Sequence, residues 1–144
     1  MKSQEDKWFL NLTGEYAVAS ELCRRKVFTT ITYGNAKKAD LYVINHTSGR
    51  MARIEVKTSE ISRWVVGQNI QPADNYFWVL VSTKLVDDNI ANRYYILSSQ
   101  EIVNISGQIG AAYSNRYSKK HGVPYNKPGV PNIKQELIHD HENE

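Results

Sequence analysis

Two acidic residues and one lysine lie in two neighbouring segments that both have the composition of β-strands. Residues 40–45 (DLYVIN) and 52–58 (ARIEVKT) are rich in apolar and β-branched residues. The stretch between them, HTSGR, contains a Ser-Gly pair that is typical of a tight turn. The two segments are therefore predicted to form a β-hairpin. Asp40 begins its first strand, and Glu55 and Lys57 lie in its second strand.

The hairpin predicts that these three side chains share one face of a sheet. Side chains alternate between the two faces of a strand, and a loop of even length puts Asp40 on the face of Glu55 and Lys57. A loop centred on Thr47 and Ser48 sets Asp40 opposite Glu55, whereas a loop centred one residue later sets it opposite Lys57. In either register the three residues lie within one pair or one diagonal, about 4.5–8 Å between Cβ atoms.

Two carboxylates that converge beside an ammonium group repel each other unless a further charge compensates them. Mg²⁺ takes carboxylate and carbonyl oxygens together with waters and substrate phosphates, and Mn²⁺ has similar preferences. We therefore expect Asp40, Glu55 and the carbonyl of Val56 to hold Mg²⁺ or Mn²⁺. Lys57 would then orient or deprotonate an attacking water. A purely structural role stays open, because an acid-x-Lys triplet arises by chance roughly once in a chain of this length.

The surrounding sequence predicts an α/β or α+β domain. Thr13 can cap a helix whose apolar residues recur at helical spacing up to Lys26. Residues 27–33 follow as a strand, residues 76–82 (YFWVLVS) are apolar enough for a central strand buried on both faces, and residues 93–97 predict another strand. Helix, three strands, a connection, two strands and a helix favour a mixed central β-sheet flanked by helices.

Other segments are expected to be shorter or less regular. Residues 59–75 predict a short helix or a long loop. A serine at position 98 or 99 can cap a second helix, with Glu101 completing the cap. The basic and aromatic stretch that follows carries three of the four prolines, so we expect an irregular arm around one short helix, ending in a short amphipathic helix. We therefore divide the chain into a core domain, residues 1–106, and a C-terminal arm, residues 107–144.

Composition excludes several classes of protein. The chain has 144 residues, of which 41% are apolar and 23% charged, so it is long enough for one globular domain. A single cysteine, Cys23, rules out an intrachain disulfide and a cysteine-built zinc site. The first residues lack a secretory signal, and no apolar run reaches the roughly 20 residues that span a bilayer. We expect a cytoplasmic protein without a membrane partner.

The small net charge of +3 hides two basic blocks. Residues 23–57 hold eight Lys and Arg against two acids, and residues 102–135 hold five Lys and Arg and no acid. Clustered cations suit a nucleic-acid backbone, and interleaved aromatics suit base stacking, although a solvated basic face is an equal alternative. The residues predicted to bind nucleic acid are Arg24, Arg25, Lys37, Lys38, Arg53, Arg116, Lys119 and Lys120.

Residues 13–83 resemble the PD-(D/E)xK nuclease superfamily, which has the restriction-endonuclease-like fold and includes Holliday junction resolvases. The resemblance rests on Glu15 at the start of a helix, a strand, Ala39-Asp40 at the start of the next strand, and Glu55-Val56-Lys57 in the third. It implies that Asp40 and Glu55 are metal ligands, Lys57 the catalytic lysine, and Glu15 an auxiliary acid near the metal. Ala39 stands where that family has its proline.

Together these features favour a metal-dependent endonuclease that hydrolyses phosphodiester bonds, with DNA as the expected substrate. Two alternatives use the same fold without catalysis. One is a nucleic-acid-binding module, which would bind in a salt-sensitive way but not cleave. The other is a protein-interaction domain, for instance a homodimer formed through residues 76–82 or through the aromatic arm.

Overall fold

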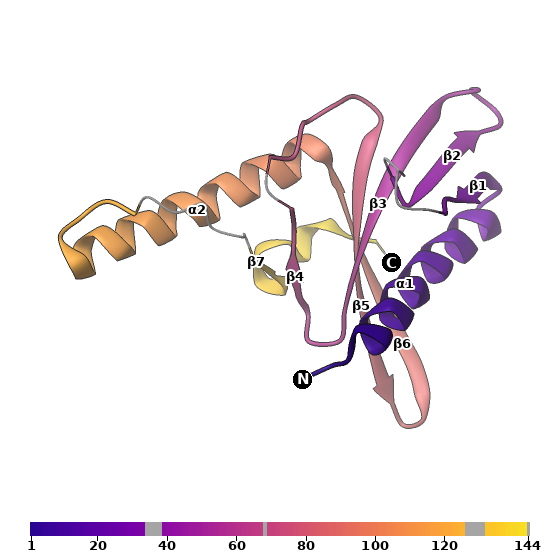
Figure 1. Cartoon of the computed structure of the whole chain (residues 1–144). Coiled ribbons are helices and arrows are strands. Elements are labelled where there is room, and N and C mark those ends of the chain that lie inside the picture. Colours follow the sequence, from indigo (N-terminus) through magenta and orange to yellow (C-terminus); the bar gives the residue numbers. More distant parts are fainter. Residues whose placement is uncertain (34–38, 68, 126–131, 144) are drawn as a thin grey trace.

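The structure is a computed structural model that describes residues 1–33, 39–67, 69–125 and 132–143. Within these residues the chain forms two α-helices, a six-stranded β-sheet and a two-stranded β-sheet (Figure 1). The elements in chain order are α1 (Gln4–Arg24), β1 (Val27–Ile31), β2 (Leu41–Asn45), β3 (Met51–Ser59), β4 (Arg63–Val65), β5 (Tyr76–Val86), β6 (Asn89–Ser98), α2 (Ser99–His121), β7 (Asn132–Lys134), the 3-10 turns η1 (Gln135–Leu137) and η2 (His139–His141), and β8 (Glu142–Asn143).

The large sheet is mixed, which confirms the predicted fold class of a mixed central sheet flanked by helices. Its strand order is β1-β2-β3-β5-β6-β8. The β3–β5 pair is parallel and each of the other neighbouring pairs is antiparallel. The strand β5 lies in the middle of the sheet, and its residues Leu80 and Val81 are fully buried on opposite faces. The predicted central strand at 76–82 is therefore confirmed.

Helix α1 covers one face of the sheet. Its Val18 and Ala19 share a buried core with Ile54 and Val56 of β3. The contact is closest at Gly14, where an added Cβ would lie 1.7 Å from the Oγ1 atom of Thr58. Only glycine leaves room for β3 at this position.

A second core lies on the opposite face, beneath β4, β7 and the first turns of α2. It contains Trp64 from β4, Tyr95 from β6, Ile102 from α2 and Ile133 from β7. The Trp64 indole donates a hydrogen bond of 2.9 Å to the carbonyl of Val81, so its polar atom is satisfied inside the core. The segment 59–75 thus contains a short strand, β4, and not the short helix that was one of the two expectations.

Helix α1 begins earlier than predicted. Ser3 caps it by accepting from the Asp6 N–H, and the Asp6 carboxylate accepts in turn from the Ser3 N–H. Thr13, the predicted cap, lies inside the helix, where its hydroxyl donates to the carbonyl of Phe9. A threonine inside a helix can donate its hydroxyl to the carbonyl four residues earlier. The hydrogen-bonding capacity of Thr13 is therefore used within the helix, and Thr13 does not cap it.

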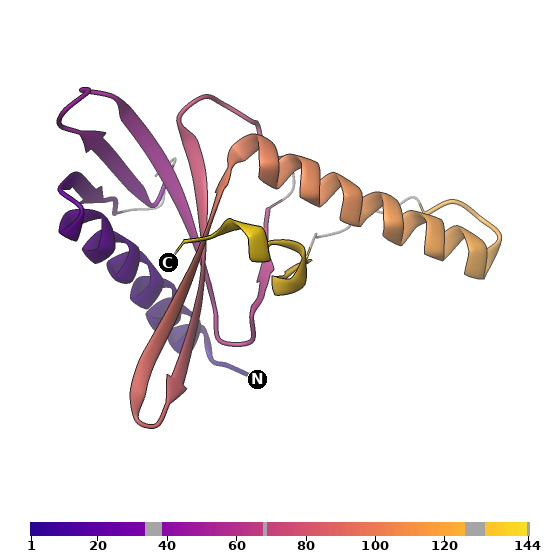
Figure 2. The same cartoon turned by 180° about the vertical axis from the view of Figure 1, so that it is seen from behind.

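The C-terminal region differs most from expectation. Helix α2 runs from Ser99 to His121, with the predicted serine cap at Ser98. The irregular arm expected from residue 107 is therefore wrong up to His121, and the boundary at 106/107 falls inside a helix. The amphipathic helix expected near the C-terminus is also wrong, because β7, two 3-10 turns and β8 occupy that stretch. Figure 2 shows the outer half of α2 projecting away from the sheet. Among the described residues, no helix is long and apolar enough to cross a membrane.

Candidate active site

Asp40 and Glu55 lie side by side where the β2–β3 ladder ends. Leu41 pairs with Ile54, so the next step of the ladder brings Asp40 beside Glu55. This is the first of the two registers allowed by the sequence. The two carboxyl groups interact, because Asp40 is among the causes that raise the pKa of Glu55. The predicted carboxylate pair is thus formed in the structure.

Hydrogen bonds fix both the backbone and the carboxylate of Asp40. The Val56 N–H donates a hydrogen bond of 2.8 Å to Asp40 Oδ2, and the Asp40 N–H donates one of 3.0 Å to the Ile54 carbonyl. Thr32 follows directly after β1, and its N–H and its hydroxyl donate to the Asp40 carbonyl at 2.9 and 3.0 Å. Asp40 is also buried. Its carboxylate is therefore fixed relative to β3 before any ligand binds.

Glu55 is half-buried, and its environment disfavours the charged form. Burial raises the pKa of its carboxyl, and the neighbouring charge of Asp40 raises it further. The Tyr76 hydroxyl opposes this shift by donating a hydrogen bond of 3.1 Å to Glu55 Oε1. The guanidinium of Arg53 lies 3.9 Å from the centre of the Tyr76 ring. Arg53 is one of the residues predicted to bind nucleic acid, and its guanidinium packs on the ring of Tyr76.

Lys57 lies two residues beyond Glu55 on the same face of β3. Its positive charge lowers the pKa of the Glu55 carboxyl and so partly offsets the effect of Asp40. The Lys57 Nζ atom is 5.9 Å from the centre of the Trp78 ring. The lysine is half-buried and lies at the edge of the second core, to which Trp78 belongs. The structure thus brings together the three residues on which the sequence argument rests.

The remaining predicted ligands are Val56 and Glu15. The N–H and C=O of one strand residue point to the same side of the strand, so the Val56 carbonyl faces the side of Asp40, beyond the last ladder pair. Glu15 is buried on the face of α1 that packs on the sheet, next to Gly14, which is level with Thr58. Its role as an auxiliary acid stays a prediction.

Two carboxylates by themselves do not complete a metal site. Among the described residues there is no group of three or more His, Cys, Asp or Glu side chains placed to hold a metal ion. The pair fits Mg²⁺ in another way, since this ion is usually held by one or two carboxylates and keeps waters and substrate phosphates as its other ligands. The mutual repulsion that raises the pKa of Glu55 is the charge imbalance that a cation would relieve.

The predicted nucleic-acid-binding residues fall into separate regions. Arg24 and Arg25 are exposed at the end of α1, where both form ion pairs with Glu21. Lys37 and Lys38 lie outside the described residues. Three further cations lie exposed on the outer half of α2 and are called the α2 cations below. They are Arg116, Lys119 and Lys120.

The α2 cations are accompanied by an aromatic cluster on the same half of the helix. Tyr117 is central to it, with ring centres 6.4 Å from Tyr113, 4.3 Å from His121 and 5.0 Å from Tyr125. Tyr113 is exposed and Tyr117 half-buried. The rings of this cluster pack on one another, and a role of these residues in nucleic-acid binding stays a prediction.

The sequence argument missed Tyr76 as a member of the site. Tyr76 is 21 residues from Glu55 and reaches it because β5 runs parallel to β3, with Arg53 paired to Tyr76. The register of a parallel pair depends on the crossover connection between its strands, and no residue spacing specifies it. The sequence did offer one signal of this contact, because Tyr76 begins the strand that was predicted to be central.

No family model and no curated protein matches the chain. Among solved structures, a bacterial homing endonuclease, I-Ssp6803I, is similar in fold, with a TM-score of 0.48 and 14% sequence identity. The alignment covers 72% of this chain and 70% of that chain. A likeness at this level assigns no activity to the chain.

Proposed function

We propose that this protein is a Mg²⁺-dependent endonuclease that hydrolyses phosphodiester bonds in DNA. The observation that carries the proposal is the Asp40–Glu55 pair, which the strand register brings side by side, with Lys57 two residues further on the same face of β3. The element order also supports it. Helix α1, strands β1 and β2, and the Glu-Val-Lys sequence in β3 follow the order expected of the PD-(D/E)xK superfamily and its restriction-endonuclease-like core.

Asp40 and Glu55, with the Val56 carbonyl, would hold the metal, and Mn²⁺ would substitute for Mg²⁺. A divalent cation bound there supplies positive charge to the scissile phosphate and lowers the pKa of a water. Asp40 is already fixed by the Val56 N–H, so its carboxylate needs little reorganisation to bind.

Lys57 and Tyr76 would act on either side of Glu55. The Lys57 ammonium group can contact a phosphate oxygen or orient the attacking water, because it lies on the same face as the carboxylates at the edge of the core. The Tyr76 hydroxyl donates to Glu55 Oε1 and so fixes the position of this carboxyl group. Glu15 would serve as an auxiliary acid.

Cleavage of a labelled DNA duplex and a single strand in Mg²⁺ tests the proposal. We expect Asp40→Asn and Lys57→Met to lower the cleavage rate at least about 100-fold. Asparagine keeps an acceptor for the Val56 N–H, so the variant should fold. Two matched controls change exposed residues away from the pair, Asp140→Asn and Lys84→Met, and should cleave like the wild type.

Cleavage at the wild-type rate by both site variants would refute the proposed chemistry. If the wild-type protein binds DNA at low salt but does not cleave it in Mg²⁺ or Mn²⁺, the protein is better described as a nucleic-acid-binding module without catalysis. In that case Asp40→Asn should leave the affinity for DNA unchanged. EDTA must abolish cleavage in the wild type if a bound divalent cation is required.

A further inference from the structure

Within the described part of the chain, the elements that cover the rest of the sheet leave one face of the three-stranded region β1–β2–β3 uncovered. Helix α1 packs on the face of Ile54 and Val56, and the second core lies over β5 and β6. The opposite face of β1–β3, called the open face below, carries large apolar side chains exposed to solvent. They are Phe28, Tyr42, Ile44 and Met51.

The strand register arranges the open face in rows that lead to the carboxylate pair. Phe28 pairs with Ile44, and Ile44 pairs with Met51, so these three side chains form one row across the strands. The next row on the same face contains Tyr42 and Arg53, and the row after it contains the Asp40–Glu55 pair. Rows on one face are about 6.6 Å apart, so the apolar row lies about 13 Å from the carboxylates.

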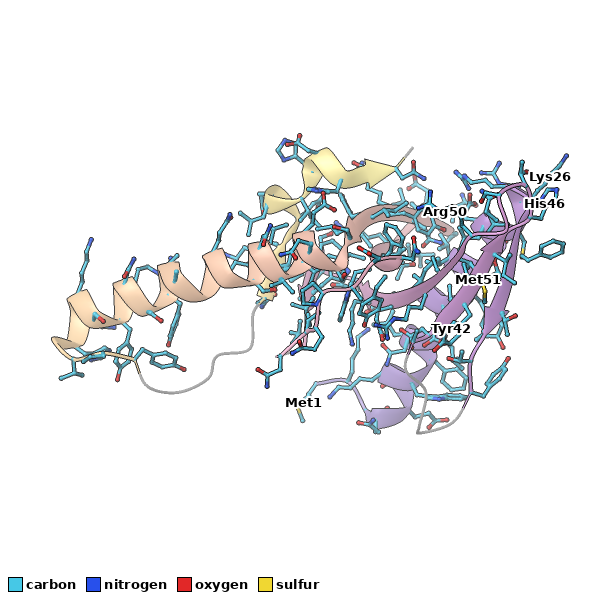
Figure 3. The ribbon with its side chains drawn as sticks, turned by 90° about the horizontal axis from the view of Figure 1, so that it is seen from above. Met1, Lys26, Tyr42, His46, Arg50 and Met51 are labelled. Atoms are coloured by element: carbon cyan, nitrogen blue, oxygen red, sulfur yellow. The ribbon has the colours of Figure 1, made fainter. Side chains whose placement is uncertain are left out.

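Positively charged residues lie in the middle and at one end of this face. Arg53 lies in its middle row, and Lys26 and Arg50 lie at the far end, near Met51 (Figure 3). The ring of His46, at the same end, contacts Phe28, with the ring centres 5.9 Å apart. In residues 23–57 the only acids are the two proposed metal ligands. A polyanion on the open face can therefore contact cations both in the middle row and at the end away from the carboxylate pair.

We propose that the open face binds a single-stranded segment of nucleic acid and leads it to the carboxylate pair. This inference rests on the proposed function and specifies its substrate. Unpaired bases offer flat apolar surfaces that stack on Phe28 and Tyr42, and the phosphates between them would contact the surrounding cations. A duplex presents phosphates and sugars at its surface, which suit the cations but leave the row of Phe28, Ile44 and Met51 without an apolar partner.

Binding without divalent cation tests this inference separately from cleavage. Fluorescence anisotropy in EDTA would measure a labelled 20-nucleotide single strand and a duplex of the same length. We expect Phe28→Ala and Tyr42→Ala each to weaken single-strand binding at least about fivefold and to change duplex binding less than twofold. The matched control is Phe9→Ala, since Phe9 is a comparably exposed phenylalanine on α1 (54%, against 65% for Phe28). It should bind like the wild type.

Three results would overturn the inference. The first is single-strand binding by Phe28→Ala and Tyr42→Ala that equals the wild type, and the second is an equal loss of single-strand and duplex binding. The third is a wild-type dimer in sedimentation that Phe28→Ala converts to a monomer, because a second copy would then cover the open face. None of these results bears on cleavage, which Asp40→Asn tests without altering the apolar row or Tyr42.

Discussion

Replacing Glu55 by glutamine should make the protein more stable at neutral pH while removing its response to Mg²⁺. Burial and Asp40 raise the pKa of the Glu55 carboxyl, so the folded state holds this proton more tightly than the unfolded chain does. Wild-type stability therefore falls as pH rises from the ordinary value of 4.5 through the raised pKa, because ionised Glu55 faces Asp40 in the folded state. Glutamine stays neutral and avoids this loss, and it can still accept the hydrogen bond from Tyr76.

The size of the gain follows from the repulsion between the two carboxylates. Two unit charges about 4 Å apart interact by about 4 kcal/mol near a protein surface and by about 1 kcal/mol in water. Glu55 is half-buried and Lys57 offsets part of the repulsion, so we expect the free energy of unfolding at pH 7.5 to rise by about 1–2 kcal/mol. For a chain of this size that raises the melting temperature by roughly 3–6 °C.

Urea unfolding of wild type and Glu55→Gln at pH 4 and pH 7.5, with and without Mg²⁺, checks the reasoning. The stability advantage of the variant should be large at pH 7.5 and small at pH 4, which lies below the ordinary pKa of 4.5 and below the raised pKa of Glu55 in the folded state. Mg²⁺ at ten times its dissociation constant should stabilise the wild type by about 1.4 kcal/mol and the variant hardly at all. A variant that is less stable than the wild type at pH 7.5, or whose advantage is the same at both pH values, would refute the argument.

Two further predictions concern the helices. Gly14→Ala should lower the free energy of unfolding by about 1–3 kcal/mol, because the added Cβ would collide with Thr58. The matched control is Gly107→Ala in α2, where the added Cβ has open space. Alanine has the higher helix propensity, so this variant should raise the free energy of unfolding by about 0.5–1 kcal/mol. Urea melts would contradict this if Gly14→Ala were as stable as the wild type. Replacing the α2 cations together by glutamine should reduce the salt dependence of duplex binding, lowering the slope of log affinity against log salt by up to about 2.7. An unchanged slope, with helix content intact by circular dichroism, would exclude α2 from the DNA contact.

The hairpin could be predicted because its information is local. The strand residues and the turn residues of 40–58 lie together in the sequence, and alternation then places Asp40 on the face of Glu55. The Tyr76 contact with Glu55 could not be predicted in this way. It depends on the parallel pairing of β3 and β5, whose register is set by how the intervening chain and β4 pack on the sheet.

The length of α2 was missed for a different reason. Gly107 and Gly110 lower helix propensity, and only Ser99 and Ile102 of the helix are buried, so the outer half lacks the apolar pattern by which sheet-packed helices are identified. Gly122 ends the helix in a left-handed conformation, with φ of 70°. That glycine was a readable stop signal, since Lys119, Lys120 and His121 precede it in the last turn.

The position of Glu55 explains how the site can be both perturbed and accessible. On its face of the sheet, β3 is the boundary between the second core over β5 and the open face over β1 and β2. Burial raises the pKa of the Glu55 carboxyl, although the hydrogen bond from Tyr76 opposes this shift, and the row that contains Tyr42 and Arg53 lies on the other side of Glu55. The carboxylate pair therefore lies where burial raises the pKa of Glu55, and a bound cation would offset the two negative charges there.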